Sequence, residues 1–202
     1  MAASVVKSVG RLLPSTSALF VCDIQERFRG AISGFPAVVE TSQRMIRAAN
    51  ILDVPVLVTE HYPKALGNTV AELKEVMKPD VAVFNKLLFS MYTPEVQNWL
   101  KERPNIKQII LVGIETHVCV LQTTLDLLSD GYEVHLIVDG VSSIKPFDRA
   151  AGLGRLGQVG TMLVSSEAVI FQLTKTAQNP RFKEISALVK VAPQHSIPTS
   201  SL

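Results

Sequence analysis

The sequence has few of the features that mark specialised classes of protein. Only two of its 202 residues are cysteines, Cys22 and Cys119, which excludes a disulfide-stapled scaffold and predicts a reducing, cytoplasmic compartment. No apolar run approaches the ~20 residues of a membrane-spanning helix. With 20 basic and 18 acidic residues and no long basic run, the chain offers no electrostatic surface for nucleic acid or an anionic membrane.

The composition is that of one globular domain. Apolar residues make up 47% of the chain and charged residues 19%, and the length allows a sizeable core. We expect an N-terminal arm at 1–16, one domain at 17–191 and a flexible tail at 192–202. The arm is basic and no acid precedes Asp23, a weak likeness to a mitochondrial transit peptide. A short arm packed on the domain is the alternative.

Strand-like and helix-like segments alternate along the chain. Short apolar runs indicate strands at 18–23, 54–59, 81–84, 107–112, 132–138 and 160–164. Helical periodicity, caps and prolines indicate helices at 36–53, 94–103, 116–130, 146–160, 166–174 and 180–190, with a short helix opened by a capping box at 69–72. This alternation predicts one α/β domain with a mostly parallel sheet.

Three polar residues lie at or near the ends of expected strands. Asp23 follows the first strand, Lys86 the third, and Cys119 lies just past the fourth. Ligands of such sheets bind outside the carboxyl ends of the strands. The fold should therefore bring an acid, an amine and a thiol to one edge of the sheet.

The stretch 109–120 is the most informative part of the chain. An apolar strand ends in Gly113, and Cys119 follows near the start of a helical pattern. Backbone amides at a helix N-terminus stabilise anions, so they can activate a thiol and hold an oxyanion. A buried structural cysteine is the alternative, because free cysteine is among the most buried residue types.

Three segments together resemble the signature segments of the isochorismatase-like cysteine hydrolases. They are 20–25 (FVCDIQ), the lysine in Asn85-Lys86, and 113–120 (GIETHVCV). The likeness spans about 17–190, and segments 59–67 and 89–91 are similar to the eukaryotic branch called isochorismatase domain-containing proteins. Three motifs in the right order on the right elements favour an active-site constellation over an isolated buried cysteine.

The resemblance implies both the fold and the site. The expected architecture is a three-layer α/β sandwich, with six mostly parallel strands and helices on both faces. The expected triad is Asp23, Lys86 and Cys119, with an oxyanion held by the backbone amides of Glu115 and Cys119. The family also implies a cis peptide bond between Ile114 and Glu115 and a homo-oligomer.

Several residues near the triad are candidates for lining a substrate pocket, although ordinary loop packing would explain them equally well. They are Phe28, His61, Tyr62, Phe89 and Met91. The nicotinamidase branch binds a metal through an Asp-x-His motif and a second histidine. Here the matching region reads EHYP at 60–63, and no other histidine occurs before His117, so we expect no metal and no cofactor.

Other patterns lead to smaller expectations. Cys22 neighbours Asp23 on a strand and should point to the opposite face as a core residue. His117 is expected to be a satisfied structural histidine. The helix at 146–160 contains Gly152, Gly154 and Gly157, so it is either loose or closely approached by another segment.

Two functions of different classes follow. The first is a metal-independent cysteine hydrolase that acts on a small amide, ureido compound or ester through a thioester on Cys119. The second is a catalytically silent protein that keeps the triad and acts through binding or regulation. The intact triad favours the hydrolase, and a nuclease is a distant third because the chain has no paired-carboxylate metal site and no basic patch.

Overall fold

The computed structural model describes residues 9–197. The expectations for the N-terminal arm and the C-terminal tail therefore fall partly outside the described residues, at 1–8 and 198–202. Within the described part, Leu12 of the arm is fully buried against the domain, and a 3-10 turn at Pro14–Thr16 leads into the first strand.

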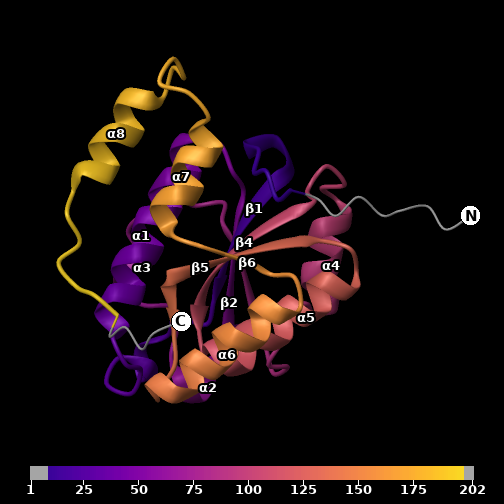
Figure 1. Ribbon diagram of the computed structural model, residues 1–202. Helices are drawn as coiled ribbons and strands as arrows, with labels where there is room; N and C mark the ends of the chain where they lie inside the picture. Colours follow the sequence, from indigo (N-terminus) through magenta and orange to yellow (C-terminus); the bar gives the residue numbers. More distant parts are fainter. Residues whose placement is uncertain (1–8, 198–202) are drawn as a thin grey trace, which may run out of the picture.

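A sheet of six parallel strands forms the centre of the molecule (Figure 1). Its strands are β1 (Ser17–Cys22), β2 (Val56–His61), β3 (Ala82–Lys86), β4 (Gln108–Ile114), β5 (Glu133–Ser142) and β6 (Met162–Val164), in the order β3-β2-β1-β4-β5-β6. The chain runs outward from β1 to β3 and returns to the centre at β4. This reversal creates a switch point between β1 and β4, where ligands of open α/β sheets bind.

Helices cover both faces of the sheet (Figure 1). One face carries α1 (Phe35–Ile51), α3 (Ala71–Lys74), α7 (Ser166–Thr174) and α8 (Phe182–Lys190), and the other carries α4 (Pro94–Lys101), α5 (Leu121–Ser129) and α6 (Pro146–Gln158). A short helix, α2 (Pro63–Leu66), follows β2. The three-layer α/β sandwich is thus confirmed. Within residues 9–197, no helix has both the length and the hydropathy that crossing a bilayer requires.

Two apolar clusters, one on each side of the sheet, hold these layers together. Side chains of β1 alternate between them: Leu19 and Val21 pack beneath α1 and α7, whereas Phe20 and Cys22 pack towards α4, α5 and α6. All residues of β1 and β4 are buried, as expected of central strands in a parallel sheet. Cys119 packs in the same cluster as Cys22.

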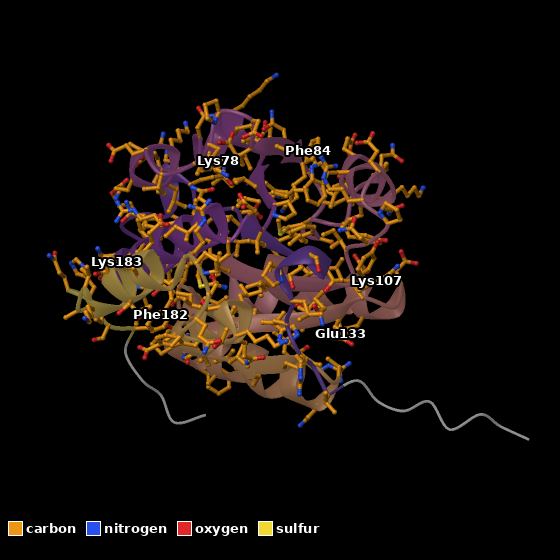
Figure 2. All side chains as sticks on the ribbon, turned by 90° about the horizontal axis from the view of Figure 1, so that it is seen from above. Lys78, Phe84, Lys107, Glu133, Phe182 and Lys183 are labelled. Atoms are coloured by element: carbon orange, nitrogen blue, oxygen red, sulfur yellow. The ribbon has the colours of Figure 1, made fainter. Side chains whose placement is uncertain are left out.

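The two ends of the sheet differ in character. Lys107 and Glu133, where β4 and β5 begin, lie together at one end, and the Glu133 amide donates to the Lys107 carbonyl at 2.9 Å (Figure 2). The opposite end, where the strands finish, carries Asp23, Lys86 and the turn that bears Cys119. The expectation that these three residues share one edge of the sheet is therefore met.

Some local predictions were wrong in detail. The helix expected at 116–130 is divided into a π-helical turn, Thr116–Val120, and α5. The strand expected to end at 138 continues through Gly140 to Ser142. The capping box at 69–72 does not form, because the Thr69 amide donates to Glu60 Oε1 at 2.6 Å and the Glu72 carboxylate binds Arg29 instead.

His135 provides a test of the core. It lies fully buried in β5, and neither ring nitrogen has a hydrogen-bond partner. Burial lowers its pKa below the ordinary value, although the charge of Glu133 opposes the shift. In the unfolded chain this histidine takes up a proton near pH 6.5, whereas in the folded protein it stays neutral to a lower pH. The free energy of unfolding therefore decreases as the pH falls below about 6.5.

We predict that His135→Leu removes this acid sensitivity. The difference in unfolding free energy between His135→Leu and wild type should grow in favour of the variant as the pH falls from 7 to 5. Urea denaturation at several pH values measures it. Parallel pH curves for the two proteins would contradict the assignment.

Candidate active site

Asp23 is held at the end of β1 by its neighbours on the next two strands. Its φ of 51° is left-handed, a conformation that Asp tolerates better than most residues. Its backbone amide donates to the Thr59 carbonyl at 3.2 Å, and its Oδ1 accepts from Thr59 Oγ1 at 2.8 Å. Oδ2 accepts from Lys86 Nζ at 2.5 Å. The carboxylate is buried, and each of its two oxygens is held by a different donor, Thr59 or Lys86.

Lys86, the last residue of β3, has its full set of donors engaged. Besides Asp23, its ammonium donates to the carbonyls of Leu88 at 3.1 Å and Phe89 at 2.8 Å. Burial by itself would lower the pKa of Lys86. The charges of Cys22, Asp23 and Cys119 and the bond to Asp23 outweigh burial and raise that pKa, so the group stays protonated at neutral pH.

Cys119 lies in the π-helical turn that follows β4. Its thiol is almost buried, its side chain packs with Cys22 and Met91, and its carbonyl accepts from Thr123 Oγ1 at 2.6 Å. The turn that bears Cys119 lies at the same end of the sheet as the Asp23–Lys86 ion pair, and the charge of Cys119 contributes to the raised pKa of Lys86. The three residues of the expected triad therefore lie at one end of the sheet, and their catalytic roles stay a prediction.

Two glycines let the surrounding backbone approach the turn. Gly113 has a φ of 124°, and a Cβ there would lie 2.1 Å from the carbonyl oxygen of Cys22. A Cβ on Gly152 would lie 3.1 Å from the backbone nitrogen of His117. The backbone at His117 thus closely approaches helix α6 at Gly152. Of the two alternatives for this glycine-containing helix, a loose helix or a close approach, the structure shows the second. The Ile114–Glu115 peptide is cis, as the resemblance implied.

The five residues that the sequence suggested as pocket residues do not lie in one place in the structure. His61 and Phe89 stack with ring centroids 5.5 Å apart, and Tyr62 is exposed beside them. Met91 is buried in the cluster of Cys119, and its amide donates to Thr123 Oγ1. Phe28 packs against the apolar cluster on the other face of the sheet. Its contribution to a pocket, like that of the other four, stays a prediction.

In the segment that matches the metal motif of the nicotinamidase branch, Glu60 is bound within the protein, whereas His61 Nδ1 is buried without a hydrogen-bond partner among the described residues. Glu60 accepts from Asn68 Nδ2 at 2.8 Å and from the Thr69 amide, and so holds a loop. Among residues 9–197, no group of three His, Cys, Asp or Glu side chains could hold a metal ion. His117 is satisfied by Ser143 Oγ at 3.0 Å and lies 3.9 Å from Asp148.

Sequence reasoning missed three residues that build the site. Thr59 binds Asp23, and its position near the end of an expected strand, like that of Asp23, was the available signal. Gln25 joins two loops through His61 and Gly67. Cys22 was correctly expected in the core, but its thiol does not turn away from Asp23: it donates to Oδ2 at 3.6 Å.

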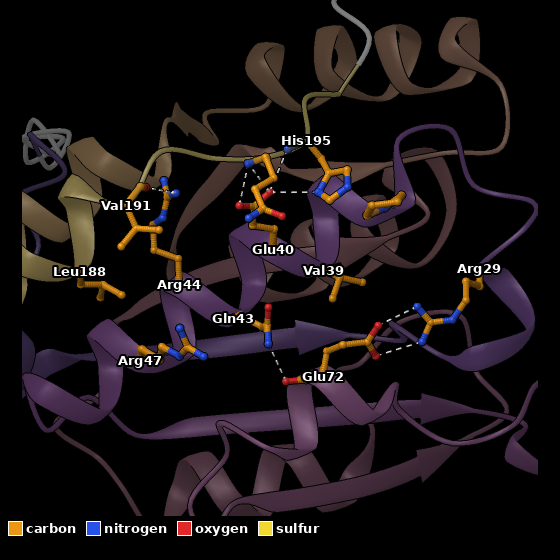
Figure 3. Close-up of a pocket in the computed structure, with 12 residues that line it drawn as sticks. Arg29, Val39, Glu40, Gln43, Arg44, Arg47, Glu72, Leu188, Val191 and His195 are labelled. Atoms are coloured by element: carbon orange, nitrogen blue, oxygen red, sulfur yellow. Dashed lines mark hydrogen bonds and ion pairs between the residues drawn. The ribbon is translucent and has the colours of Figure 1, made fainter.

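Two cavities are relevant to ligand binding. One, of about 290 Å³, reaches Lys86 and is lined by Tyr62, Pro63, Lys64, Asn85, Lys86 and Leu87. A slightly larger one, of about 330 Å³, lies between α1, α8 and the C-terminal segment, where Arg44, Glu40 and His195 meet (Figure 3). No triad residue lines this second cavity, so its size does not make it the site.

Residues 17–168 match the Isochorismatase domain. The chain belongs to the isochorismatase family. A secreted isochorismatase effector of Phytophthora sojae is 49% identical over 190 residues, which cover 93% of this chain and 90% of that protein. Isochorismatase domain-containing protein 2 of Macaca fascicularis is 47% identical over 183 residues, covering 90% and 87%.

The fold comparison agrees with the sequence comparison. The structure of a protein called MAR1 ribonuclease from Caenorhabditis elegans superimposes with a TM-score of 0.88 and 46% identity, covering 95% of this chain and all of that one. The resemblance drawn from the three motifs is thereby confirmed at the level of the family.

The buried ion pair makes the first prediction for this site. Lys86→Met removes the cation and leaves Asp23 buried without its partner, which should cost about 3–5 kcal/mol of stability. The double variant Asp23→Asn/Lys86→Met should be more stable than Lys86→Met, because no charge is then stranded. Urea denaturation at pH 7 measures both.

Lys78 provides a matched control. It pairs with Asp53 at 3.9 Å on the surface, so Lys78→Met should change stability by less than about 0.5 kcal/mol. Equal losses in Lys78→Met and Lys86→Met would contradict the special cost of the buried pair.

Proposed function

We propose that this isochorismatase family member is a cysteine hydrolase that needs no metal and cleaves a small amide, ureido compound or ester. The observation that carries the proposal is the buried bond between Lys86 and Asp23 at the end of the sheet that also carries the turn with Cys119. A carboxylate held next to a thiol by a cation is suited to proton transfer, and a thiol is suited to acyl transfer.

The reaction would begin with proton transfer from Cys119 to Asp23. The thiolate then attacks the substrate carbonyl, and the oxyanion is stabilised by the backbone amides of Glu115 and Cys119. Asp23 returns the proton to the leaving amine or alcohol, which departs and leaves a thioester. Lys86 keeps Asp23 oriented through these steps, because its three N–H bonds leave it no freedom to turn away.

Water completes the cycle by hydrolysing the thioester. Asp23 accepts a proton from this water, and the thiolate of Cys119 leaves and is reprotonated. The substrate should be small, because the cavity beside Lys86 is at the lower end of the volumes found for ligand sites. His61, Tyr62, Phe89 and Met91 are the residues proposed to contact it, with Phe28 less directly placed.

The cysteines and the exposed apolar side chains support proposals on the compartment and the assembly of the protein. Two unpaired cysteines in the core favour a reducing compartment such as the cytoplasm, with a mitochondrial location as the alternative from the basic N-terminus. We also propose a homo-oligomer. Apolar side chains exposed on and after the edge strand β3 support it, namely Val83, Leu87, Leu88 and Phe89.

Two other functions are outcomes of the tests below. A silent binding protein would keep the ion pair but show no acyl transfer. The name of the Caenorhabditis elegans relative assigns a ribonuclease activity to that protein. A single-stranded RNA oligonucleotide therefore belongs in the substrate screen beside amides, ureido acids and esters.

Trapping the acyl intermediate tests the proposal. We predict that p-nitrophenyl acetate gives a burst of p-nitrophenolate and an acetyl group on the peptide that contains Cys119. Asp23→Asn should slow acetylation by about 10²-fold or more, since it removes the general base. Stopped-flow absorbance and peptide mass spectrometry measure the two effects.

Cys119→Ala is the control for labelling elsewhere. It should lose both the burst and the acetyl group on this peptide. An undiminished burst in Cys119→Ala, or equal acetylation of wild type and Asp23→Asn, would overturn the mechanism and favour the binding function.

A further inference from the structure

The two cysteines of the chain pack in the same buried apolar cluster, although 96 residues separate them in the sequence. Cys22 ends β1, and its register partner on β4 is Gly113. Because Gly113 has no side chain, β4 passes close to Cys22 and leads into the turn that carries Cys119. Both thiols are free, and both side chains pack in the same buried apolar cluster.

The proposed acyl transfer gives Cys22 no role, but its surroundings are those of a reactive group. Its thiol donates to Asp23 Oδ2 at 3.6 Å, so it contacts the oxygen that also binds Lys86. The carboxylate proposed as the base for Cys119 is thus in contact with the Cys22 thiol. A buried cysteine that served only as core packing would not need a bond to this base.

The two thiols differ in access. Cys119 is 8% exposed, whereas Cys22 is 0% exposed. Burial, the interaction with Cys119 and the charge of Asp23 raise the pKa of Cys22 well above its ordinary value. A reagent from solution therefore meets Cys119 first, and Cys22 stays a protonated thiol until its neighbour has reacted.

We propose that Cys119 and Cys22 form a peroxide-sensitive dithiol, in which Cys119 is oxidised first and Cys22 closes an intramolecular disulfide. Cys119 gives its proton to Asp23, and its thiolate attacks one oxygen of a hydroperoxide. The O–O bond breaks, Cys119 becomes a sulfenic acid, and the departing oxygen takes the proton from Asp23 and leaves as water or an alcohol. Cys22 gives its proton to Asp23 and attacks the Cys119 sulfur. The S–O bond breaks, and hydroxide takes the proton and leaves as water.

The electrons balance, because two thiols supply the two electrons that reduce one peroxide. The disulfide blocks the thiol proposed as nucleophile and also prevents its further oxidation to sulfinic acid. A dithiol reductant restores both cysteines. The two thiols must approach each other for the disulfide to form, and the fold packs both cysteines in one buried cluster. The inference depends on this packing and not on turnover of any acyl substrate.

The test compares wild type with Cys22→Ala under hydrogen peroxide. After treatment at pH 7, the remaining thiols are blocked with N-ethylmaleimide, and the masses of the tryptic peptides are measured by mass spectrometry. Wild type should lose two hydrogens and yield a linked peptide containing Cys22 and Cys119, and dithiothreitol should return both to the labelled form. In Cys22→Ala, Cys119 should pass to sulfinic acid, which dithiothreitol does not reverse.

Two further variants keep the test interpretable. Cys119→Ala should leave Cys22 reduced under the same peroxide treatment, because Cys22 is buried. Cys22→Ser changes the core volume less than Cys22→Ala and replaces it if the latter fails to fold by near-ultraviolet circular dichroism.

The inference is overturned if Cys119 of wild type goes to sulfinic acid as readily as in Cys22→Ala, or if only disulfides between two chains form. The acetylation test uses reduced protein and does not involve Cys22. A protein that acetylates Cys119 without forming the disulfide would therefore refute this inference alone. A protein that forms the disulfide without acetylation would refute the hydrolase proposal alone.

Discussion

Lys86 and Asp23 hold opposite charges 2.5 Å apart in a region that water hardly reaches. Removing such charges from water costs several kcal/mol for each ion, and the pair is tolerated only when further hydrogen bonds complete it. The carbonyls of Leu88 and Phe89 and the hydroxyl of Thr59 provide these bonds. The ends of β1, β2 and β3 and the loop after β3 are therefore fixed relative to one another by one electrostatic requirement.

Close backbone packing positions the turn that bears Cys119 at the same end of the sheet as this pair. Gly113 lets β4 pass against Cys22, and Gly152 lets α6 press on the turn at His117. Neither position has room for a Cβ without a shift of the neighbouring atoms. The site thus combines the ion pair, which strands β1 and β3 position, with a thiol that follows β4 on the other side of the switch point. The two parts meet at Cys22 and Asp23.

Much of this arrangement follows from the sequence. Apolar runs that end in Asp23 and Lys86 predict parallel strands that deliver both residues to one edge, and three motifs identify the family. Strand order does not follow, because periodicity says nothing of which strands are neighbours. The orientation of Cys22 was misjudged because Asp23 leaves the strand geometry with a φ of 51° and turns back towards the thiol. The π-helical turn and the partner of Thr59 depend on tertiary contacts that local patterns do not contain.

The central claim is that the ion pair prepares Cys119 for attack. The most direct measurement is the rate at which iodoacetamide alkylates Cys119 at pH 7 in wild type, Asp23→Asn and Lys86→Met, followed on the Cys119 peptide by mass spectrometry. The account predicts that each variant reacts at least about tenfold more slowly, because Asp23→Asn removes the group that accepts the thiol proton and Lys86→Met removes the group that orients it. Equal rates in all three folded proteins would mean that the thiol is independent of its neighbours, and would contradict the account.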